Sequence, residues 1–465
     1  MIDLFIREDQ PCVSTLSNNS NIKLHLLPIN GNRNDSATIK RIAQEASVNP
    51  IAIYNSNNEF RPGFNWVKRI ENLMSDTSIA MLYSDYRKID AKGNSLANPT
   101  IEYQIGSVRD DFDFGPLTIW NAEIFKSAAD TMSDDIQFNA LYEIRLIAST
   151  KGKIFHLGEM LYETAEPDNR TSGEKQFDYV NPANRAYQIE MEETFTRHLK
   201  RINGFIANDR LTPDFSGDFP VEASVIIPVR NRVKTISQAI ESAATQVTNF
   251  PFNVIVIDNH STDGTSEEIE RTKAKFFNVV HIIPERHNLG IGGCWNLGIN
   301  DSNCGRFSVQ LDSDDLYSST NTLQAIYDKF IEEKCAMVIG SYSLTDFNLQ
   351  PIPPGLIDHK EWTDSNGRNN ALRINGLGAP RAFLTNILRE IGIPNVSYGE
   401  DYALGLRISR DYHIGRIYES LYLCRRWEGN SDSNLDISRV NANNRYKDTL
   451  RSIELSQRIQ LNSKH

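Results

Sequence analysis

Residues 307–316 read FSVQLDSDDL, a short apolar run that ends in three aspartates within four positions. Continuous apolar runs of this length, bounded by turn residues, are typical of strands that are buried on both faces of a sheet. Three similar runs precede it at Ala223–Pro228, Asn253–Ile257 and Val279–Ile283, and helical patterns separate them. The alternation predicts an α/β fold in which helices cover both faces of a parallel sheet.

The aspartates after this strand, Asp312, Asp314 and Asp315, stand where open α/β sheets bind ligands, at the carboxyl end of a strand. Clustered carboxylates repel one another unless a positive charge lies among them. Mg²⁺ or Mn²⁺ is suited to this position, because one or two carboxylates can hold it while it also grips substrate phosphates. A solvated turn is the alternative interpretation.

Two other strands of the same half end in polar loops. Residues 225–231 read VIIPVRN, and residues 256–265 read VIDNHSTDGT. In the second loop Asp258 stands at the strand end, where it can accept a hydrogen bond from a base or a ribose. We assign Asp263 to capping a helix that begins near Ser266.

An acidic pair opens an apolar helix at residues 398–407, which read YGEDYALGLR. Carboxylates in the first turn of a helix favour its dipole, so capping alone would account for Glu400 and Asp401. A carboxylate fixed on a rigid element is also well placed to act as a general base. Both interpretations stay open from these residues alone.

The overall composition limits the class of protein. The chain has 465 residues, and its 49 lysines and arginines against 60 aspartates and glutamates give a net charge of −11. The length predicts two or three domains, and the acidic balance argues against nucleic acid as a partner. The charged first ten residues do not resemble a signal peptide, and the five cysteines form no CxxC pair. We therefore expect a cytoplasmic protein, with peripheral contact to the inner face of a membrane left open.

The first third of the chain repeats features of the second half in the same order. Residues 24–28, LHLLP, are similar to residues 280–284, VHIIP, and Ala80–Leu82 is similar to Ala336–Val338. A repeat in unchanged order predicts a duplicated fold, with chance similarity of strand composition as the alternative.

Aligned in this way, the first copy lacks the carboxylates of the second. Asn55–Glu59 stands at the position of the aspartate-rich loop, and Ala140-Leu141 stands at that of the acidic pair. Extrapolated backwards, its first strand would precede Met1. We therefore expect no metal site and no general base in the first copy.

In order and spacing, the four segments of the second half resemble the inverting GT-A-fold glycosyltransferases of family 2 over about residues 221–435. The resemblance implies the Rossmann-like fold of nucleotide-diphospho-sugar transferases and a Mn²⁺ or Mg²⁺ cofactor. It implies transfer of a hexose or N-acetylhexosamine from a nucleotide-diphosphate sugar to a hydroxyl. The acceptor would be a glycan or a lipid-linked precursor of a surface polysaccharide.

The same resemblance assigns roles to residues. Asp312-Ser313-Asp314 looks like the DxD motif, with Asp314 as the metal ligand and Asp312 as a ribose or metal contact. Asp401 would be the base, supported by Glu400, and arginines would share the charge of the diphosphate: Arg230, Arg381 or Arg426. The expected nucleotide-sugar contacts are Pro228, Val229, Arg230, Asp258, Asn288, Gly290, Asp312 and Ser313.

Two features of residues 423–430 depart from the family pattern. Where many relatives place a metal-binding histidine, residues 425–430 read RRWEGN, which leaves Glu428 or Asn430 as substitutes. The pair Arg426-Trp427 is similar to the QxxRW motif of processive relatives, but Leu423 stands where the glutamine belongs. We therefore expect one sugar to be transferred at a time.

The predicted domains are residues 1–170, a GT-A-like domain without activity; 171–220, a helical strap and linker; 221–435, the catalytic domain; and 436–465, a C-terminal helix. Apolar residues at helical spacing between Asn184 and Phe205 predict the strap. The first domain would serve acceptor binding, homodimer contacts or stability, and an unrelated α/β domain is the alternative.

Two other functions remain as rivals. A sugar-phosphate nucleotidyltransferase uses a similar sheet, but its usual glycine-rich opening with Arg and Lys is absent after Pro228. A non-catalytic scaffold that binds nucleotide sugars or glycans is the other, and the retained carboxylates between Asp258 and Asp401 argue against it. A resemblance of fold alone does not decide between them.

Overall fold

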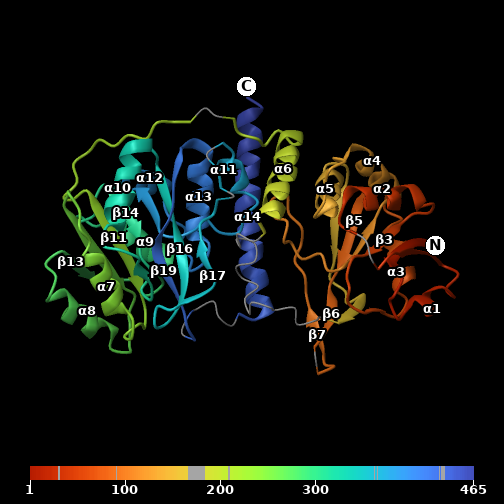
Figure 1. Cartoon of the computed structure of the whole chain (residues 1–465), viewed down its shortest axis with the longest axis horizontal. Coiled ribbons are helices and arrows are strands. Elements are labelled where there is room, and N and C mark those ends of the chain that lie inside the picture. The colour runs from red at the N-terminus through yellow and green to blue at the C-terminus, as the bar shows by residue number, and fades with distance from the viewer. Residues whose placement is uncertain are drawn as a thin grey trace. The chain divides into compact units, whose positions relative to one another are not determined.

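The computed structural model describes residues 1–29, 32–90, 92–165, 184–207, 210–360, 362–363, 365–428, 430 and 435–464. The chain divides into two compact units (Figure 1). Unit 1 takes Met1–Gly173, Ala186–Phe205 and Leu435–His465, and unit 2 takes Glu174–Arg185 and Ile206–Asn434. The boundary expected at residues 170–171 and the linker residues Asn208 and Asp209 lie outside the described residues.

Unit 2 contains a nine-stranded sheet, with strand order β13-β12-β11-β14-β18-β16-β19-β15 and with β17 paired to β16. Its strands are β11 (Ala223–Val229), β12 (Phe252–Asp258), β13 (Val279–Ile282), β14 (Phe307–Gln310), β15 (Leu316–Tyr317), β16 (Met337–Asp346), β17 (Pro351–Ile357), β18 (Arg381–Leu384) and β19 (Ile414–Arg426). Strands β11 to β14 are parallel, with Val225 opposite both Val254 and Val309. The α/β fold and its four parallel strands are confirmed.

Beyond these four parallel strands the sheet is mixed. Strand β18 runs antiparallel to both of its neighbours, β14 and β16. The sequence did not reveal this, because the four residues RAFL of β18 have the same apolar signature in either direction. This reversed strand carries Arg381 into the middle of the sheet.

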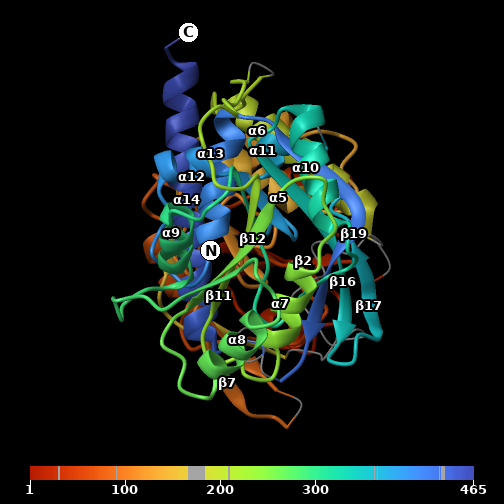
Figure 2. The same ribbon diagram turned by 90° about the vertical axis from the view of Figure 1, so that its left-hand side faces the viewer.

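Helices cover the sheet of unit 2 on both faces. They are α7 (Ile236–Ala244), α8 (Thr265–Lys273), α9 (Ile291–Asn300), α10 (Thr322–Glu333), α11 (Gly367–Asn370), α12 (Thr385–Ile391) and α13 (Glu400–Asp411). Figure 2 shows α7 and α8 beside β12, which both helices contact. Helix α9 packs on β11 and β12 so closely that a Cβ on Gly298 would lie 3.1 Å from the side chain of Ile257.

Unit 1 contains a six-stranded sheet of order β2-β1-β3-β8-β5-β9 and a four-stranded sheet of order β4-β10-β6-β7. Its strands are β1 (Ile2–Arg7), β2 (Ile22–Leu27), β3 (Ile51–Tyr54), β4 (Phe60–Pro62), β5 (Ile79–Ser84), β6 (Tyr86–Ile89), β7 (Ser95–Asn98), β8 (Leu117–Trp120), β9 (Lys153–Leu157) and β10 (Tyr162–Ala165). Its helices are α1 (Val13–Leu16), α2 (Ser36–Glu45), α3 (Trp66–Leu73), α4 (Ala122–Thr131), α5 (Ala140–Ala148), α6 (Arg185–Arg201) and α14 (Ile437–Asn462).

The two units share one topology. Each strand of the six-stranded sheet of unit 1 has a counterpart in unit 2: in chain order, β1, β2, β3, β5, β8 and β9 correspond to β12, β13, β14, β16, β18 and β19. The corresponding strands have the same parallel and antiparallel neighbours. The smaller sheet of unit 1 repeats the pairing of β15, β19, β16 and β17. Among the described residues of unit 1, β1 pairs directly with β3, whereas β11 separates the corresponding strands of unit 2. The strand order therefore supports the predicted internal duplication, including the strand missing from the first copy.

The helices α6 and α14 both pack within unit 1. Glu190 of α6 accepts hydrogen bonds from the backbone of Gln137 and Phe138 at 2.7 and 2.9 Å. On α14 the buried Asp448 accepts from Ser107 at 3.0 Å and from Arg451 at 2.8 Å. In the part of the chain that the structure describes, neither helix nor any other is long and apolar enough to cross a membrane.

Candidate functional site

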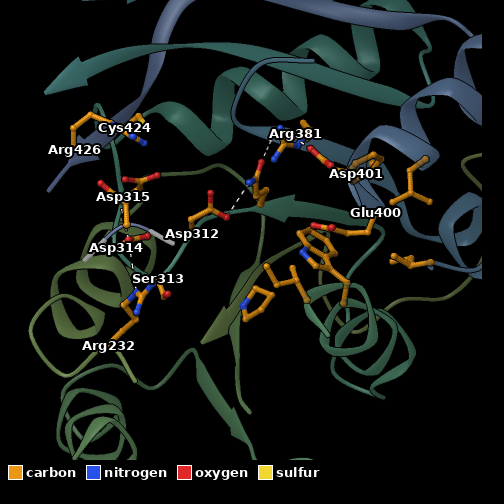
Figure 3. A pocket seen from close by; sticks show the side chains of 18 residues that line it. Arg232, Asp312, Ser313, Asp314, Asp315, Arg381, Glu400, Asp401, Cys424 and Arg426 are labelled. Atoms are coloured by element: carbon orange, nitrogen blue, oxygen red, sulfur yellow. Dashed lines mark hydrogen bonds and ion pairs between the residues drawn. The ribbon is translucent and has the colours of Figure 1, made fainter. Parts of the chain in front are cut away.

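A cavity of about 280 Å³ opens in unit 2 where β11 and β14 end and where α13 begins (Figure 3). Its wall combines the ends of several strands with the first turn of a helix, as expected for a site at the edge of an open α/β sheet. The lining residues are Pro228, Arg232, Ile291, Trp295, Gln310, Asp312, Ser313, Asp314, Asp315, Arg381, Phe383, Ile393, Glu400, Asp401, Leu404, Cys424, Arg426 and Asn430.

The aspartate-rich loop between β14 and β15 is fixed by β19. The backbone N–H of Asp312 donates to the hydroxyl of Tyr422 at 3.0 Å. The carboxylate of Asp315 accepts from the backbone N–H of Arg425 at 2.8 Å. Because both partners lie on one long strand, the loop presents its carboxylates on a rigid support, as a binding site requires.

Two carboxyl groups of this loop, those of Asp312 and Asp315, have a raised pKa. Asp315 is buried, and burial followed by the charges of Asp314 and Asp312 raises its pKa well above the ordinary range. The side chain of Asp312 is open to the cavity. Even so, desolvation by the surrounding protein raises its pKa. Arg381 partly offsets that rise, and the charge of Asp314 adds to it. The loop therefore carries negative charge that the protein alone does not fully neutralise.

Asp314 is held by residues that follow β19. Its Oδ2 accepts from the indole Nε1 of Trp427 and from the amide Nδ2 of Asn430, each at 3.3 Å. The guanidinium Nε of Arg232 lies 3.7 Å from the same oxygen. The amide oxygen of Asn430 accepts from the backbone N–H of Trp427 at 2.7 Å, and Glu428 is exposed. In this arrangement Asn430 turns its amide nitrogen toward Asp314 and its amide oxygen toward the backbone of Trp427.

The acidic pair faces the same cavity from the first turn of α13. Asp401 forms an ion pair with Arg381, whose Nη1 lies 3.0 Å from its Oδ2. The same Nη1 donates to the carbonyl of Gly378 at 2.6 Å, which fixes the direction of the guanidinium. The Oε2 of Glu400 is buried, and none of the residues that the structure describes forms a hydrogen bond with it. Burial, and then the charge of Asp401, raises the pKa of Glu400 to about 8.

The raised pKa of Glu400 predicts a pH-dependent stability. The folded protein keeps a proton that the unfolded chain loses between the ordinary value of 4.5 and about 8, so stability falls as pH rises through that window. Glu400→Gln is expected to raise the thermal midpoint at pH 9 and to leave it unchanged at pH 4. Thermal melts across this range test the prediction, with Glu419→Gln on the exposed part of β19 as the matched control. Parallel curves for Glu400→Gln and wild type would contradict it.

Gln310 joins the two acidic groups. Its amide Nε2 donates to Oδ1 of Asp312 at 2.9 Å, and its Oε1 accepts from the backbone N–H of Arg381 at 3.2 Å. Figure 3 shows Arg381 between the carboxylates of Asp312 and Asp401. A continuous set of contacts thus fixes the spacing between the aspartate-rich loop and α13.

Not every residue expected at the site lies in the cavity. Pro228, Asp312, Ser313, Asp314, Glu400 and Asp401 line it together. Val229 is buried in the sheet, Arg230 is exposed outside this lining, and Asn288 and Gly290 do not reach it. The nucleotide-contact roles of these four residues stay predictions.

Asp258 also lies outside this cavity and organises the loop after β12. Its Oδ1 accepts from the backbone N–H of Ser261 at 3.0 Å, and its Oδ2 accepts from the hydroxyl of Ser266. The Nε2 of His281 lies 3.8 Å from the same Oδ2.

The stretch 288–292 is clamped to the segment before α13. The backbone N–H of Gly290 donates to Asn395 at 2.7 Å, and Asn395 donates to the carbonyl of Asn288 at 3.1 Å. A Cβ on Gly292 would lie 1.9 Å from the carbonyl oxygen of Pro394, so only glycine fits there. These contacts hold residues 288–292 against the segment that leads into α13.

Comparison with known proteins identifies the part of the chain that carries the aspartate-rich side of this cavity. Residues 224–383 match the model of glycosyl transferase family 2. These residues form a family 2 glycosyltransferase domain. The matched range contains all of β11 but its first residue, together with the aspartate-rich loop and Arg381, while Asp401 and Asn430 follow it within unit 2.

Curated relatives of the glycosyltransferase domain include an uncharacterized glycosyltransferase of Rickettsia felis, 38% identical over 250 residues that cover 50% of this chain and 39% of that protein. Another, from Rickettsia bellii, is 42% identical over 205 residues that cover 43% of this chain and 28% of that protein. A poly(ribitol-phosphate) beta-glucosyltransferase of Bacillus spizizenii is 24% identical and covers 44% and 33%. The chain therefore spans less than half the length of each relative.

Solved structures with a similar fold include S. aureus TarS 1–349 in complex with UDP-GlcNAc, at 21% identity and a TM-score of 0.39, covering 50% of this chain and 71% of that chain. The mannosyltransferase PcManGT from Pyrobaculum calidifontis, in complex with GDP-Man and Mn²⁺, is 14% identical with a TM-score of 0.36, covering 60% and 85%.

Two residues that line this cavity, Arg232 and Gln310, were not predicted as site residues from the sequence. A signal for Gln310 was present: it stands two positions before Asp312, and residues two apart on a strand face the same side. Arg232 carried no such signal, because its approach to Asp314 depends on how the loop after β11 folds. Arg381 and Arg426, considered from sequence as partners of a diphosphate, both line the cavity.

Proposed function

We propose that the glycosyltransferase domain moves one sugar at a time from a nucleoside-diphosphate sugar to a hydroxyl acceptor, with inversion at the anomeric carbon. The observation that carries the proposal is one cavity, lined both by the aspartate-rich loop of the family 2 domain and by the acidic pair of α13, which follows that domain in unit 2. Such a pairing matches the chemistry of the transfer, which needs charge compensation at the departing diphosphate and a base at the acceptor.

In the proposed reaction Asp401 takes the proton of the acceptor hydroxyl while the acceptor oxygen bonds to the anomeric carbon. The bond from that carbon to the diphosphate oxygen breaks, and the nucleoside diphosphate leaves with the electron pair. Approach from the face opposite the leaving group inverts the configuration. Arg381, 3.0 Å from Asp401, orients the carboxylate, and Glu400 beside it remains protonated at neutral pH because its pKa is about 8.

The residues at the other side of the cavity fit a diphosphate with a divalent cation. Among the described residues no group of three His, Cys, Asp or Glu side chains is arranged to hold a metal by itself. Mg²⁺ and Mn²⁺ sites of this kind need only one or two carboxylates, because phosphate oxygens supply other ligands. Asp314, with Asp312, would hold the ion, which would act as a Lewis acid toward the departing diphosphate. Arg232 and Arg426 line the same side and add positive charge.

The acceptor in this proposal is a glycan or a lipid-linked precursor of a surface polysaccharide. The similarity to a poly(ribitol-phosphate) beta-glucosyltransferase supports a hydroxyl-rich polymer of this class. The rival scaffold function would keep the cavity and need no base. A measurement of sugar transfer, rather than of nucleotide-sugar binding, distinguishes the scaffold from a transferase.

Nucleoside diphosphates are expected to raise the thermal midpoint of the full chain in Mn²⁺ or Mg²⁺, and to lose this effect in EDTA. A ligand at 100 times its Kd stabilises the folded state by about 2.7 kcal/mol, which a thermal melt resolves easily. UDP, GDP and dTDP are screened with and without metal, and the corresponding nucleosides serve as controls. If none of the three diphosphates stabilises the protein, the cavity is not a nucleotide-sugar site.

A further inference from the structure

The turn between β16 and β17 places an aromatic ring against the end of β19. Strands β19, β16 and β17 are neighbours in the sheet of unit 2 (Figure 2). In the parallel pairing of β16 with β19, the last residues of the two strands, Asp346 and Arg426, stand opposite each other. Continued by one residue, this register brings Phe347 to Trp427. The centres of these two rings lie 5.3 Å apart, with the ring planes at 50°.

The backbone of this turn is closed by hydrogen bonds around Asp346. Its backbone N–H donates to the carbonyl of Gln350 at 2.8 Å, and its carbonyl accepts from the N–H of Leu349 at 3.1 Å. Its carboxylate accepts from the N–H of Gln350 at 2.8 Å. These bonds fix the direction in which Phe347 leaves the backbone. The ring therefore has a defined place, although Phe347 remains 37% exposed.

This one ring packs on two residues that hold Asp314. The indole Nε1 of Trp427 donates to Oδ2 of Asp314 at 3.3 Å. The guanidinium carbon of the buried Arg425 lies 5.5 Å from the ring centre of Phe347, within the range of a cation–π contact. The Nε of the same guanidinium donates to the backbone carbonyl of Asp314. Phe347 thus supports both the group that holds the carboxylate and the group that holds the main chain of this aspartate.

These contacts bear on the binding of a cation by Asp314. Trp427 and Asn430 both donate to Oδ2, so a cation would take the other carboxylate oxygen, Oδ1. An indole N–H donates a hydrogen bond and cannot ligate a metal, so Trp427 can act on the cation only through Asp314. Loss of a hydrogen bond that orients a metal-binding side chain typically lowers metal affinity about 10- to 100-fold.

We propose that Phe347 is a positioning residue, through which the turn between β16 and β17 sets the affinity of the site for its divalent cation. The ring keeps Trp427 against Asp314, and the indole N–H keeps the carboxylate turned for the cation. This role rests on the proposed function, which assigns a divalent cation to Asp314. It extends the site to a ring outside the cavity lining.

The test measures the Mn²⁺ concentration that gives half of the thermal shift by a nucleoside diphosphate, on the full chain, with UDP, GDP and dTDP each in fixed excess. Trp427→Phe keeps a ring beside Phe347 and removes the indole N–H, so it is expected to raise this concentration at least about tenfold. Phe347→Ala is expected to raise it in the same direction, by at least about threefold, because it acts through the indole. Mn²⁺ binding without nucleotide, followed by EPR, gives a readout that does not depend on turnover.

Leu356→Ala is the matched control for Phe347→Ala. Leu356 is 39% exposed on β17 of the same hairpin and stands opposite Ser343, away from the turn. The control should need the same Mn²⁺ concentration as wild type. The thermal midpoint without ligand, read in the same melts, shows whether each variant folds. If Trp427→Phe does not fold, the comparison of Phe347→Ala with Leu356→Ala decides the outcome alone.

The double variant Phe347→Ala/Trp427→Phe separates positioning from general packing. Because Phe347 acts through the indole N–H, the double variant should need no more Mn²⁺ than Trp427→Phe alone. Multiplication of the two single effects, or single variants equal to wild type, would overturn this role while Mn²⁺-dependent stabilisation of wild type leaves the proposed function standing. Stabilisation of wild type that does not depend on Mn²⁺ would remove the metal from the proposed function and this role with it.

Discussion

Asp401→Asn is expected to lower kcat at least about 100-fold, the usual scale for loss of a general base, while the affinity for the donor stays near that of wild type. The amide keeps the shape of the carboxylate and can still accept from the backbone N–H of Tyr402 through its oxygen. It loses the negative charge that attracts Arg381 and the capacity to take a proton. Steady-state kinetics together with donor binding by calorimetry separate these two effects.

Glu400→Gln is the matched control for this experiment, because it removes the neighbouring carboxyl group of the same helical turn. Glu400 already holds its proton at neutral pH, since its pKa is about 8, so the variant should retain most of the turnover there. The reverse result, with Asp401→Asn active and Glu400→Gln inactive, would assign the base to Glu400. Glu400, whose pKa is raised to about 8, would then take the proton of the acceptor hydroxyl when it is ionised above that pH.

Much of the fold and part of the site were predictable from local sequence. Continuous apolar runs such as Val225–Val229 and Phe307–Gln310 indicate buried strands wherever they occur, and parallel strands bring their carboxyl ends to one edge. Asp312 and Asp314 therefore had to approach the loop after β11 at that edge. The duplication was also readable, because similar segments recur in the same order in both copies.

The contacts that fix the site were not predictable in the same way. Gln310 and Arg381 are 71 residues apart, and they meet only because β18 enters the sheet in the reverse direction beside β14. The direction of a short apolar strand depends on the whole sheet and leaves no local signature. The position of Trp427 and Asn430 on Asp314 likewise depends on where β19 ends.

The first copy shows the same division between what sequence can and cannot reveal. Replacement of carboxylates at Asn55–Asn58 and at Ala140-Leu141 could be read directly, and it predicts the loss of the metal site and the base. The first copy also keeps a cavity, which could not be read, since its wall gathers side chains from Asn55 to Arg145 through tertiary packing. The loss of the carboxylates is thus visible in the sequence, whereas the cavity that remains is visible only in the three-dimensional structure.

Asp314→Ala is expected to abolish metal-dependent nucleotide binding and turnover while the protein stays folded. The carboxylate is the one that Trp427, Asn430 and Arg232 hold at the cavity wall, so its loss removes the oxygen ligand best fixed for a cation. Its charge also raises the pKa of Asp312 and of Asp315, so removal relieves repulsion in the free protein. The thermal midpoint without ligand should therefore hold or rise slightly, despite the lost hydrogen bonds.

Two measurements make this prediction decisive, the thermal shift by nucleoside diphosphates with Mn²⁺ and sugar transfer with and without EDTA. Asp328→Ala, at an exposed carboxylate of α10, is the matched control and should behave as wild type in both. Full activity of Asp314→Ala, or of wild type in EDTA, would mean that Arg232 and Arg426 compensate the diphosphate without a metal. In that case Arg232→Ala should become the inactivating change, because its guanidinium is released from Asp314 and can contact the phosphates. The arginine side chain would then neutralise the diphosphate in place of the proposed divalent cation.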